Sequence, residues 1–226
     1  MIESLVMSRL ILPDRSRLDR FASALSLQEI FYRETPVQAP ADSALILSPC
    51  RSKVERIAPI AADGRIADKK VLGRRRFFSL DDLSEDDASL AAYQGGCYVN
   101  LYLAPWDYHF VIFPVAGRIT AAFRRDGFNW PVVAWGGAWL RNTRLVSVIE
   151  TRFGFPMALM MVASWNVGGI EPLFELDREY ERADRFGRFR IGSTVILLFP
   201  PGAVEVLCYE GQKLELGAPL ARTARL

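Results

Sequence analysis

The residues best placed for chemistry are Gly192, Ser193 and Thr194, which open an apolar, β-branched run ending at Phe199. Glycine weakens a strand interior, and Ser and Thr usually lie where water or backbone satisfies their hydroxyls. Two interpretations are open. Either a loop enters a buried strand here and its hydroxyls bond to backbone, or the Ser193 hydroxyl attacks the Gly192 carbonyl and the chain cleaves itself.

His109 is the only histidine in the chain and the second candidate for chemistry. With its ordinary pKa of about 6.5, an imidazole can accept or donate a proton near neutral pH. A single histidine at a strand edge is also commonly a structural residue, held by a hydrogen bond to backbone. Both roles stay open at this point.

Composition limits the classes of function. The 226 residues are half hydrophobic, which is enough for one sizeable core. Because 28 basic and 26 acidic residues nearly balance, there is no general electrostatic argument for nucleic acid. Three widely spaced cysteines predict neither a disulfide framework nor a metal site, and they favour a reducing compartment. We expect no signal peptide and no membrane-spanning segment, because the first residues lack a basic region with a cleavage site and no apolar run is long enough.

The elements that must position these residues are mostly strands. Residues 18–32 have helical periodicity, so an N-terminal helical segment and linker are expected over residues 1–40, followed by one β domain over 41–226. One helix signal follows, at Ser79 before residues 80–83. Short β-rich runs bounded by Gly and Pro predict strands at 44–47, 53–57, 98–103, 110–113, 118–123, 145–151, 157–164, 193–199 and 204–208.

Two charged stretches interrupt this pattern, at residues 74–76 and 177–190. For each, a solvated face or loop is favoured over a site for phosphate or a lipid headgroup.

Residues 48–54 and 113–119 repeat one pattern: a Pro, two residues, a small residue, a basic residue and a β-branched residue. Two copies of such a turn between strands predict a quasi-symmetric structure. The fold class that follows is mainly β, a β-rich α+β protein. We expect an antiparallel β domain resembling a barrel-sandwich, with a short N-terminal helical segment.

Several stretches, in order from residue 44 to 221, resemble motifs of the phosphatidylserine decarboxylase family. Ser-Pro-Cys at 48–50 and Phe-Ser-Leu at 78–80 fall in family order. The more specific matches are Tyr-Leu-Ala-Pro-Trp-Asp-Tyr-His at 102–109, Glu-Thr-Arg-Phe-Gly at 150–154, Asn-Val-Gly-Gly-Ile at 166–170, and Gly-Ser-Thr at 192–194 with Phe-Pro-Pro-Gly at 199–202.

The resemblance implies that the chain cleaves itself between Gly192 and Ser193 and leaves a pyruvoyl group, the cofactor, at residue 193. Such a ketone condenses with a substrate amine and accepts the electrons released as carbon dioxide leaves. The implied function is pyruvoyl-dependent decarboxylation of phosphatidylserine or a related serine-headed lipid, as a step of phospholipid biosynthesis. The implied protein is cytoplasmic or peripheral at the inner membrane and takes a phospholipid or membrane surface as its partner. The resemblance is also compatible with a homodimer.

The resemblance also assigns roles to residues. His109 falls on the family histidine associated with decarboxylation, which implies that it delivers a proton to the carbanion. Asp107 and Tyr108 are expected to shape the turn and the pocket wall. Asn166 and Gly168 are candidates for the substrate pocket, although a tight structural turn is favoured for them.

Two residues depart from the family pattern. The family activates its serine with an Asp and a His, and the corresponding positions hold Arg51 and Ile112. A serine without an adjacent base is a weak nucleophile, so processing should be slower by orders of magnitude. Asp63 is the alternative turn acid if the alignment shifts, and Arg51 is an alternative stabiliser of the oxyanion at Gly192.

These departures leave two other functions open. One is a catalytically degenerate, unprocessed family member that binds a lipid or protein. The other is a pyruvoyl-dependent decarboxylase of a soluble amino acid.

Overall fold

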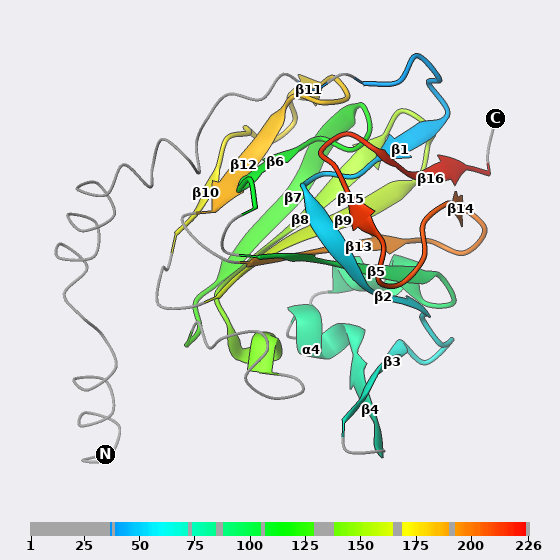
Figure 1. Cartoon of the computed structure of the whole chain (residues 1–226), viewed down its shortest axis with the longest axis vertical. Helices are drawn as coiled ribbons and strands as arrows, with labels where there is room; N and C mark the ends of the chain where they lie inside the picture. Colours follow the sequence, from blue (N-terminus) through cyan, green and yellow to red (C-terminus); the bar gives the residue numbers. More distant parts are fainter. Residues whose placement is uncertain are drawn as a thin grey trace, which may run out of the picture. The chain divides into compact units, whose positions relative to one another are not determined.

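The computed structural model describes residues 37, 39–71, 74–84, 88–104, 107–128, 138–164, 169–189 and 193–224 (Figure 1). The helical segment expected near the N-terminus lies outside these residues. Its boundary with the β domain stays a prediction. Among the helices that the structure describes, none is long and apolar enough to cross a bilayer.

An eight-stranded antiparallel sheet forms the centre of the β domain. Its strands lie in the order β11-β7-β8-β9-β13-β5-β2-β15. The bounds are β2 (Ser52–Pro59), β5 (Cys97–Leu103), β7 (Gly117–Arg125), β8 (Arg144–Thr151), β9 (Pro156–Ala163), β11 (Glu179–Tyr180), β13 (Ser193–Phe199) and β15 (Lys213–Leu214).

Strand β13 is in the middle of this sheet, and its residues divide between two cores. Val195, Leu197 and Phe199 contribute to one buried cluster, and Ile196 and Leu198 to the other. All five are fully buried, because both faces of the sheet are covered.

Two small antiparallel sheets contribute to the first core. One has the order β10-β12-β6 and the other β1-β16-β14. Their bounds are β1 (Leu45–Leu47), β6 (Phe110–Ile112), β10 (Ile170–Pro172), β12 (Arg185–Phe189), β14 (Val204–Val206) and β16 (Pro219–Thr223). The result is a sandwich of separate antiparallel sheets rather than a closed barrel within the described part of the chain. The prediction of a mainly β, antiparallel fold is confirmed.

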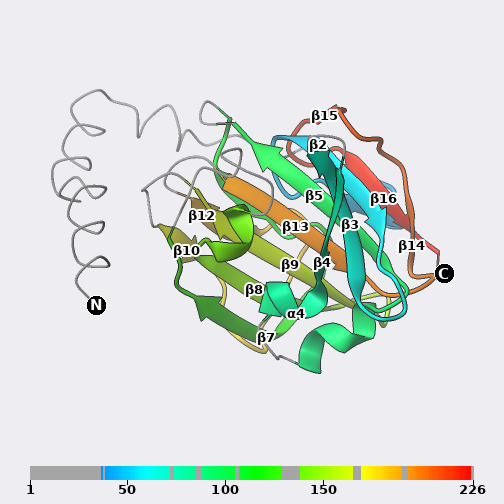
Figure 2. The same cartoon turned by 90° about the horizontal axis from the view of Figure 1, so that it is seen from below.

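A two-stranded hairpin and short helices cover the second core (Figure 2). The hairpin is β3 (Arg65–Val71) with β4 (Arg74–Ser79), and it leads into α4 (Leu80–Ser84). The Asp82 N–H donates to Ser79 Oγ at 3.1 Å, and the Ser79 N–H donates to the Asp82 carboxylate at 2.7 Å. This reciprocal pair caps the helix, so the predicted helix start at Ser79 is confirmed. Two 3₁₀ helices, η1 (Ala88–Tyr93) and η2 (Ala138–Arg141), follow further along the chain.

The two repeated turns lie side by side and exchange equivalent hydrogen bonds. The Ile112 N–H donates to the Pro49 carbonyl, and the Leu47 N–H donates to the Pro114 carbonyl, both at 2.9 Å. Each donor precedes the proline of its own turn by two residues, so the pair is locally symmetric. The short sequence repeat therefore reflects a real structural relation.

The nine strands predicted from the sequence are all present, within two residues at each end. The loop alternative for the charged stretches was wrong. Residues 177–190 contain β11 and β12, in which Phe186 and Phe189 are buried, and residues 74–76 lie in β4. Alternating charges hid these strands, because a strand exposed on one face needs apolar residues only at every second position.

Candidate active site

Three strands of the main sheet connect to three strands of a small sheet at one corner of the sandwich. Their order is β9-β13-β5 in the main sheet and β10-β12-β6 in the small one. Residues 164–169 connect β9 to β10, residues 104–109 connect β5 to β6, and residues 190–192 connect β12 to β13. Because the order is preserved, β13 in the main sheet and β12 in the small sheet are both the middle strand of their three (Figures 1 and 2).

The hydrogen-bond register defines this corner. The backbone of Ser193 pairs with Leu103 of β5 and with Ala163 of β9. On the other side of the corner, Phe189 pairs with Ile170, and its N–H donates to the His109 carbonyl at 2.9 Å. The connection that contains the Gly192–Ser193 bond is thus fixed at both of its ends.

This topology relates the motifs that the sequence singled out. His109 follows β5, the strand on one side of β13, and residues 166–168 fall in the sequence between β9, the strand on the other side, and β10. Gly192, Asn166 and Gly168 themselves lie outside the described residues, so their roles stay predictions. The structure describes the backbone of Ser193 as the first residue of β13.

His109 is completely buried. Burial lowers the pKa of its imidazole from 6.5 to about 4, and a hydrogen bond with the backbone of Asp107 acts in the opposite direction. The side chain is therefore neutral at physiological pH. The expectation of an ordinary pKa near 6.5 was wrong, because the sequence did not show how deeply this residue is enclosed.

Asp107 and Tyr108 shape the connection, as expected. The Asp107 carboxylate accepts the Ala104 N–H at 2.8 Å, and the Asp107 N–H donates to the Ala104 carbonyl at 2.9 Å, which closes a tight turn after β5. Tyr108 is buried, and its ring stacks on Phe110 with centroids 5.4 Å apart. The Arg185 guanidinium lies over the Phe110 ring, 5.1 Å from its centroid.

The two positions that depart from the family are also neighbours. Ile112 donates its N–H to Pro49, two residues before Arg51. Ile112 is buried, whereas the Arg51 side chain is 43 % exposed. Its guanidinium lies 3.2 Å from the carboxylate of Glu215, whose side chain is 73 % exposed. Arg51 therefore has a surface partner, and this geometry gives no support to a role at the Gly192 oxyanion.

Cys50 is a neighbour of this corner that sequence reasoning did not assign to it. Burial raises the pKa of its thiol to about 12, and the Asp107 carboxylate contributes in the same direction. The thiol is therefore protonated and does not act as a base. No sequence signal indicated this proximity, since Cys50 and Asp107 are joined only by the fold.

Asp63 is not the missing acid. It occupies the exposed turn between β2 and β3, where its carboxylate pairs with Arg65 at 2.6 Å. The nearby end of β2, Pro59, pairs with Cys97, which in turn pairs with Phe199. Phe199 and Ser193 are the opposite ends of β13, about 20 Å apart at the usual rise of a strand. The alternative alignment with Asp63 was therefore wrong.

Comparison with known proteins identifies one family. A family model described as phosphatidylserine decarboxylase matches residues 27–222. Curated relatives called phosphatidylserine decarboxylase proenzyme include one from Saccharophagus degradans, 32 % identical over 194 residues, which cover 75 % of this chain and 65 % of the relative. One from Acidovorax ebreus is 33 % identical over 211 residues, or 82 % of this chain and 72 % of the relative. One from Bacillus cereus is 32 % identical over 206 residues, which cover 87 % of this chain and 76 % of the relative. The chain thus spans between about two thirds and three quarters of the length of these relatives.

Proposed function

The chain belongs to the phosphatidylserine decarboxylase family, and on that basis we propose that it cleaves itself between Gly192 and Ser193 and decarboxylates phosphatidylserine or a related serine-headed lipid. The observation that carries the proposal is the corner at which Ser193 begins a central strand. Ser193 pairs on one side with β5, the strand that leads to His109, and on the other side with β9, after which Asn166 and Gly168 follow in the sequence.

In the cleavage step, the Ser193 oxygen attacks the Gly192 carbonyl carbon and the peptide C–N bond breaks, which leaves an ester and a free amine. Elimination then breaks the ester C–O bond and releases the carboxylate of residue 192. Hydrolysis of the resulting terminus releases ammonia and leaves a ketone at residue 193. The fragments are residues 1–192 and 193–226.

Strand β13 suits this position, because it pairs with β5 and β9 along its length and its residues 194–199 are buried. The new terminus would therefore stay at the corner after the peptide bond is cut. A pyruvoyl group at residue 193 would supply an electron sink for the pair released as carbon dioxide leaves.

His109 is the residue that we expect to transfer a proton beside that group. His109 is kept in place through Phe189 and the Asp107 turn. As a neutral imidazole it must first gain a proton before it can donate one. A substrate carboxylate brought close to it would favour the protonated form, since an opposite charge within about 4–6 Å raises the pKa of a histidine. The proton then goes to the carbon that has lost carbon dioxide.

One specific observation favours a second candidate function, that of an unprocessed family member that binds lipid or protein. At the two activating positions, Ile112 is an apolar side chain and Arg51 pairs with Glu215. Neither side chain can accept a proton from a serine hydroxyl.

Intact mass and denaturing electrophoresis of the purified protein separate these two functions. The proposal predicts two fragments, with the N-terminus of the 34-residue fragment blocked to Edman sequencing, and release of carbon dioxide from phosphatidylserine. Ser193→Ala should remain uncut, and Ser147→Ala, which removes a buried serine of β8 in the same sheet, should cut normally. His109→Ala should cut but release no carbon dioxide. A single chain of 25.4 kDa in the unaltered protein would contradict the proposal and favour the unprocessed binding protein.

A further inference from the structure

The β3–β4 hairpin carries an unusual concentration of positive charge. Five cations fall within residues 69–76, namely Lys69, Lys70, Arg74, Arg75 and Arg76. Residues 68–77 contain one acidic residue, Asp68. Since the whole chain has a net charge of only +2, the rest of the molecule is close to neutral or slightly acidic.

Like charges are placed opposite each other in this hairpin. Lys70 pairs directly with Arg75 across the two strands, and β3 and β4 form a sheet of their own. A directly opposed pair of cations destabilises a hairpin in water. An anionic partner would remove that cost, which is a physical reason for such an arrangement.

The base of the hairpin is partly buried. Ile66 and Phe78 lie in the second core, whereas Phe77, on the other face of β4, is 59 % exposed. An exposed aromatic ring next to cations is typical of segments that lie at the interface of a membrane, where the ring enters the headgroup region and the cations meet phosphates.

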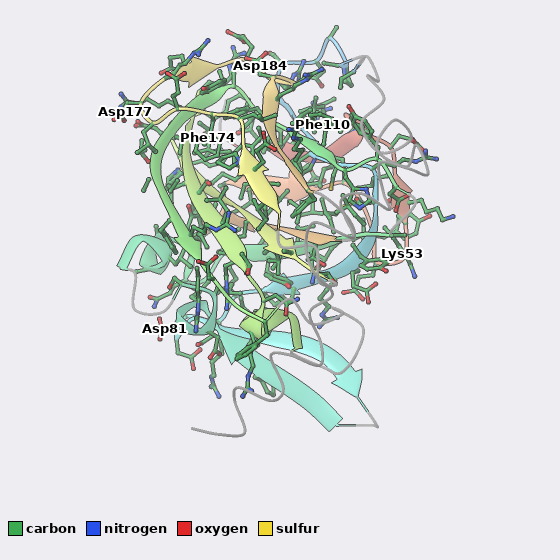
Figure 3. All side chains as sticks on the ribbon, turned by 90° about the vertical axis from the view of Figure 1, so that its left-hand side faces the viewer. Lys53, Asp81, Phe110, Phe174, Asp177 and Asp184 are labelled. Carbon is green, nitrogen blue, oxygen red and sulfur yellow. The ribbon has the colours of Figure 1, made fainter. Side chains whose placement is uncertain are left out.

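The direction of the hairpin relates it to the candidate active site. Ile66 forms an antiparallel bridge with Ile60, and Arg56 Nε donates to the Ala67 carbonyl at 3.1 Å, so β3 runs back along β2. The cationic half thus extends toward the start of β2, where Lys53 pairs with Tyr102, the residue beside Thr194. Figure 3 shows β3 and β4 projecting from the main sheet, with their free ends on the same side of the view as Lys53.

We propose that the β3–β4 hairpin is the surface by which this protein docks on an anionic lipid bilayer. Its cations contact lipid phosphates, and Phe77 inserts at the headgroup level. Docking through this hairpin would bring the end of the sheet that contains Ser193 toward the bilayer. The proposal deepens the proposed function by assigning the membrane surface, but the binding that it describes requires neither self-cleavage nor decarboxylation.

Sedimentation with vesicles tests the proposal without catalysis. The probes are vesicles of phosphatidylcholine alone and of phosphatidylcholine mixed with phosphatidylglycerol, an anionic lipid that has no amine to react. The full chain should bind the mixed vesicles and not the neutral ones, and added salt should weaken the binding. Replacing Arg74, Arg75 and Arg76 together with Gln should weaken binding on the order of 100-fold, at about fivefold for each cation. Phe77→Ser should weaken it with no change in net charge.

A matched control removes the same charge elsewhere. Arg118, Arg152 and Arg178, which are exposed and outside the hairpin, are replaced together with Gln, and this variant should bind like the unaltered protein. Circular dichroism verifies that each variant is folded, and Arg75→Gln alone gives a milder change if the triple variant is not. Equal binding by the hairpin variants and the control would overturn the proposal. So would binding to a duplex oligonucleotide as tight as that to the mixed vesicles, which would indicate a nucleic-acid surface.

Activity distinguishes failure of this proposal from failure of the proposed function. If the protein decarboxylates phosphatidylserine, the triple hairpin variant should lose activity on vesicles and keep it on substrate in detergent micelles. Equal activity of this variant on both forms of substrate would overturn docking while leaving the proposed function intact. Vesicle binding by an uncut, inactive chain would support docking and contradict the proposed function.

Discussion

The imidazole of His109 is fully buried, beside the turn closed by Asp107 and the backbone of Phe189. Its environment is therefore apolar enough to keep it neutral, and its position is fixed before any substrate arrives. Such a residue combines two properties that a free histidine lacks: a single orientation and a strong preference for the uncharged form.

This burial predicts a specific dependence of stability on pH. The pKa of His109 is about 4 in the folded protein, against 6.5 for the ordinary group, so between these values the unfolded chain binds a proton that the folded protein does not. The free energy of unfolding should then fall as pH is lowered from 6.5 to 4, by up to about 3 kcal/mol. Urea unfolding at several pH values measures this fall in the free energy of unfolding. Because the chain has no other histidine, His109→Gln is the matched control, and its stability should fall less over this range. Parallel curves for the two proteins would contradict the prediction.

The neighbouring positions Arg51 and Ile112 predict slow processing that can be accelerated. The Ile112–Pro49 hydrogen bond holds the two positions in adjacent segments, so a carboxylate and an imidazole introduced there would be close enough to act together. Arg51→Asp combined with Ile112→His should increase the rate of cleavage by at least tenfold, since an activating base contributes about 10²–10⁴. The rate is followed by electrophoresis after synthesis in a cell-free system. Arg51→Asp with Ile112→Gln supplies the acid without the base and should give no such gain. An unchanged rate in the first variant would mean that the activating groups lie elsewhere.

At the scale of elements, a buried arginine joins the short helices to the main sheet. Arg144, the first residue of β8, is almost completely buried, and its guanidinium donates to the carbonyls of Asp82 at 2.9 Å and Leu83 at 3.2 Å, and also to that of Leu140. The first two carbonyls belong to α4, whose last turn has no further helix to bond them. The third belongs to η2.

Replacing this arginine should destabilise the cover of the second core. Arg144→Met keeps the length and the apolar stem of the side chain but leaves the carbonyls without their donor. The free energy of unfolding should fall by about 3 kcal/mol. Arg118→Met is the control, because its guanidinium pairs with Glu150 at an exposed site, and it should change stability by less than about 1 kcal/mol. Urea unfolding of both variants measures the difference. If Arg144→Met lowers the free energy of unfolding no more than the control does, these hydrogen bonds contribute little to stability.

The same elements show how far sequence could predict this fold. Strands such as β9 and β13 are buried on both faces, so their continuous apolar runs stood out. Strands β3, β4 and β12 were missed because their apolar positions are few and charged residues separate them. The motifs indicated the Gly192–Ser193 bond and His109, but the order of strands that brings them to one corner depends on pairing between distant segments. The low pKa of His109 depends on the same packing and was likewise not predictable.

At the scale of the whole molecule, the proposed cut would divide one hydrophobic core between two chains. Residues 193–226 supply β13 to the centre of the main sheet, β15 to its edge, and β14 and β16 to a small sheet with β1. Their large buried side chains are Val195, Ile196, Leu197, Leu198, Phe199, Leu214 and Leu220. At about 2 kcal/mol for each, burial of these side chains contributes on the order of 14 kcal/mol before the loss of conformational freedom is subtracted.

The cleaved protein should therefore behave as a tight complex of two chains. On native gel filtration, both fragments should elute together, and they should separate only in denaturant. Because unfolding then releases two molecules, the urea midpoint of the cleaved protein should rise with protein concentration. The uncut Ser193→Ala chain should show no such dependence. Leu197→Ala should lower the midpoint of both forms, at a cost of about 2–5 kcal/mol for an emptied core position. Loss of the small fragment on native gel filtration, or a midpoint of the cleaved form independent of concentration, would show that β13 does not hold the two chains together.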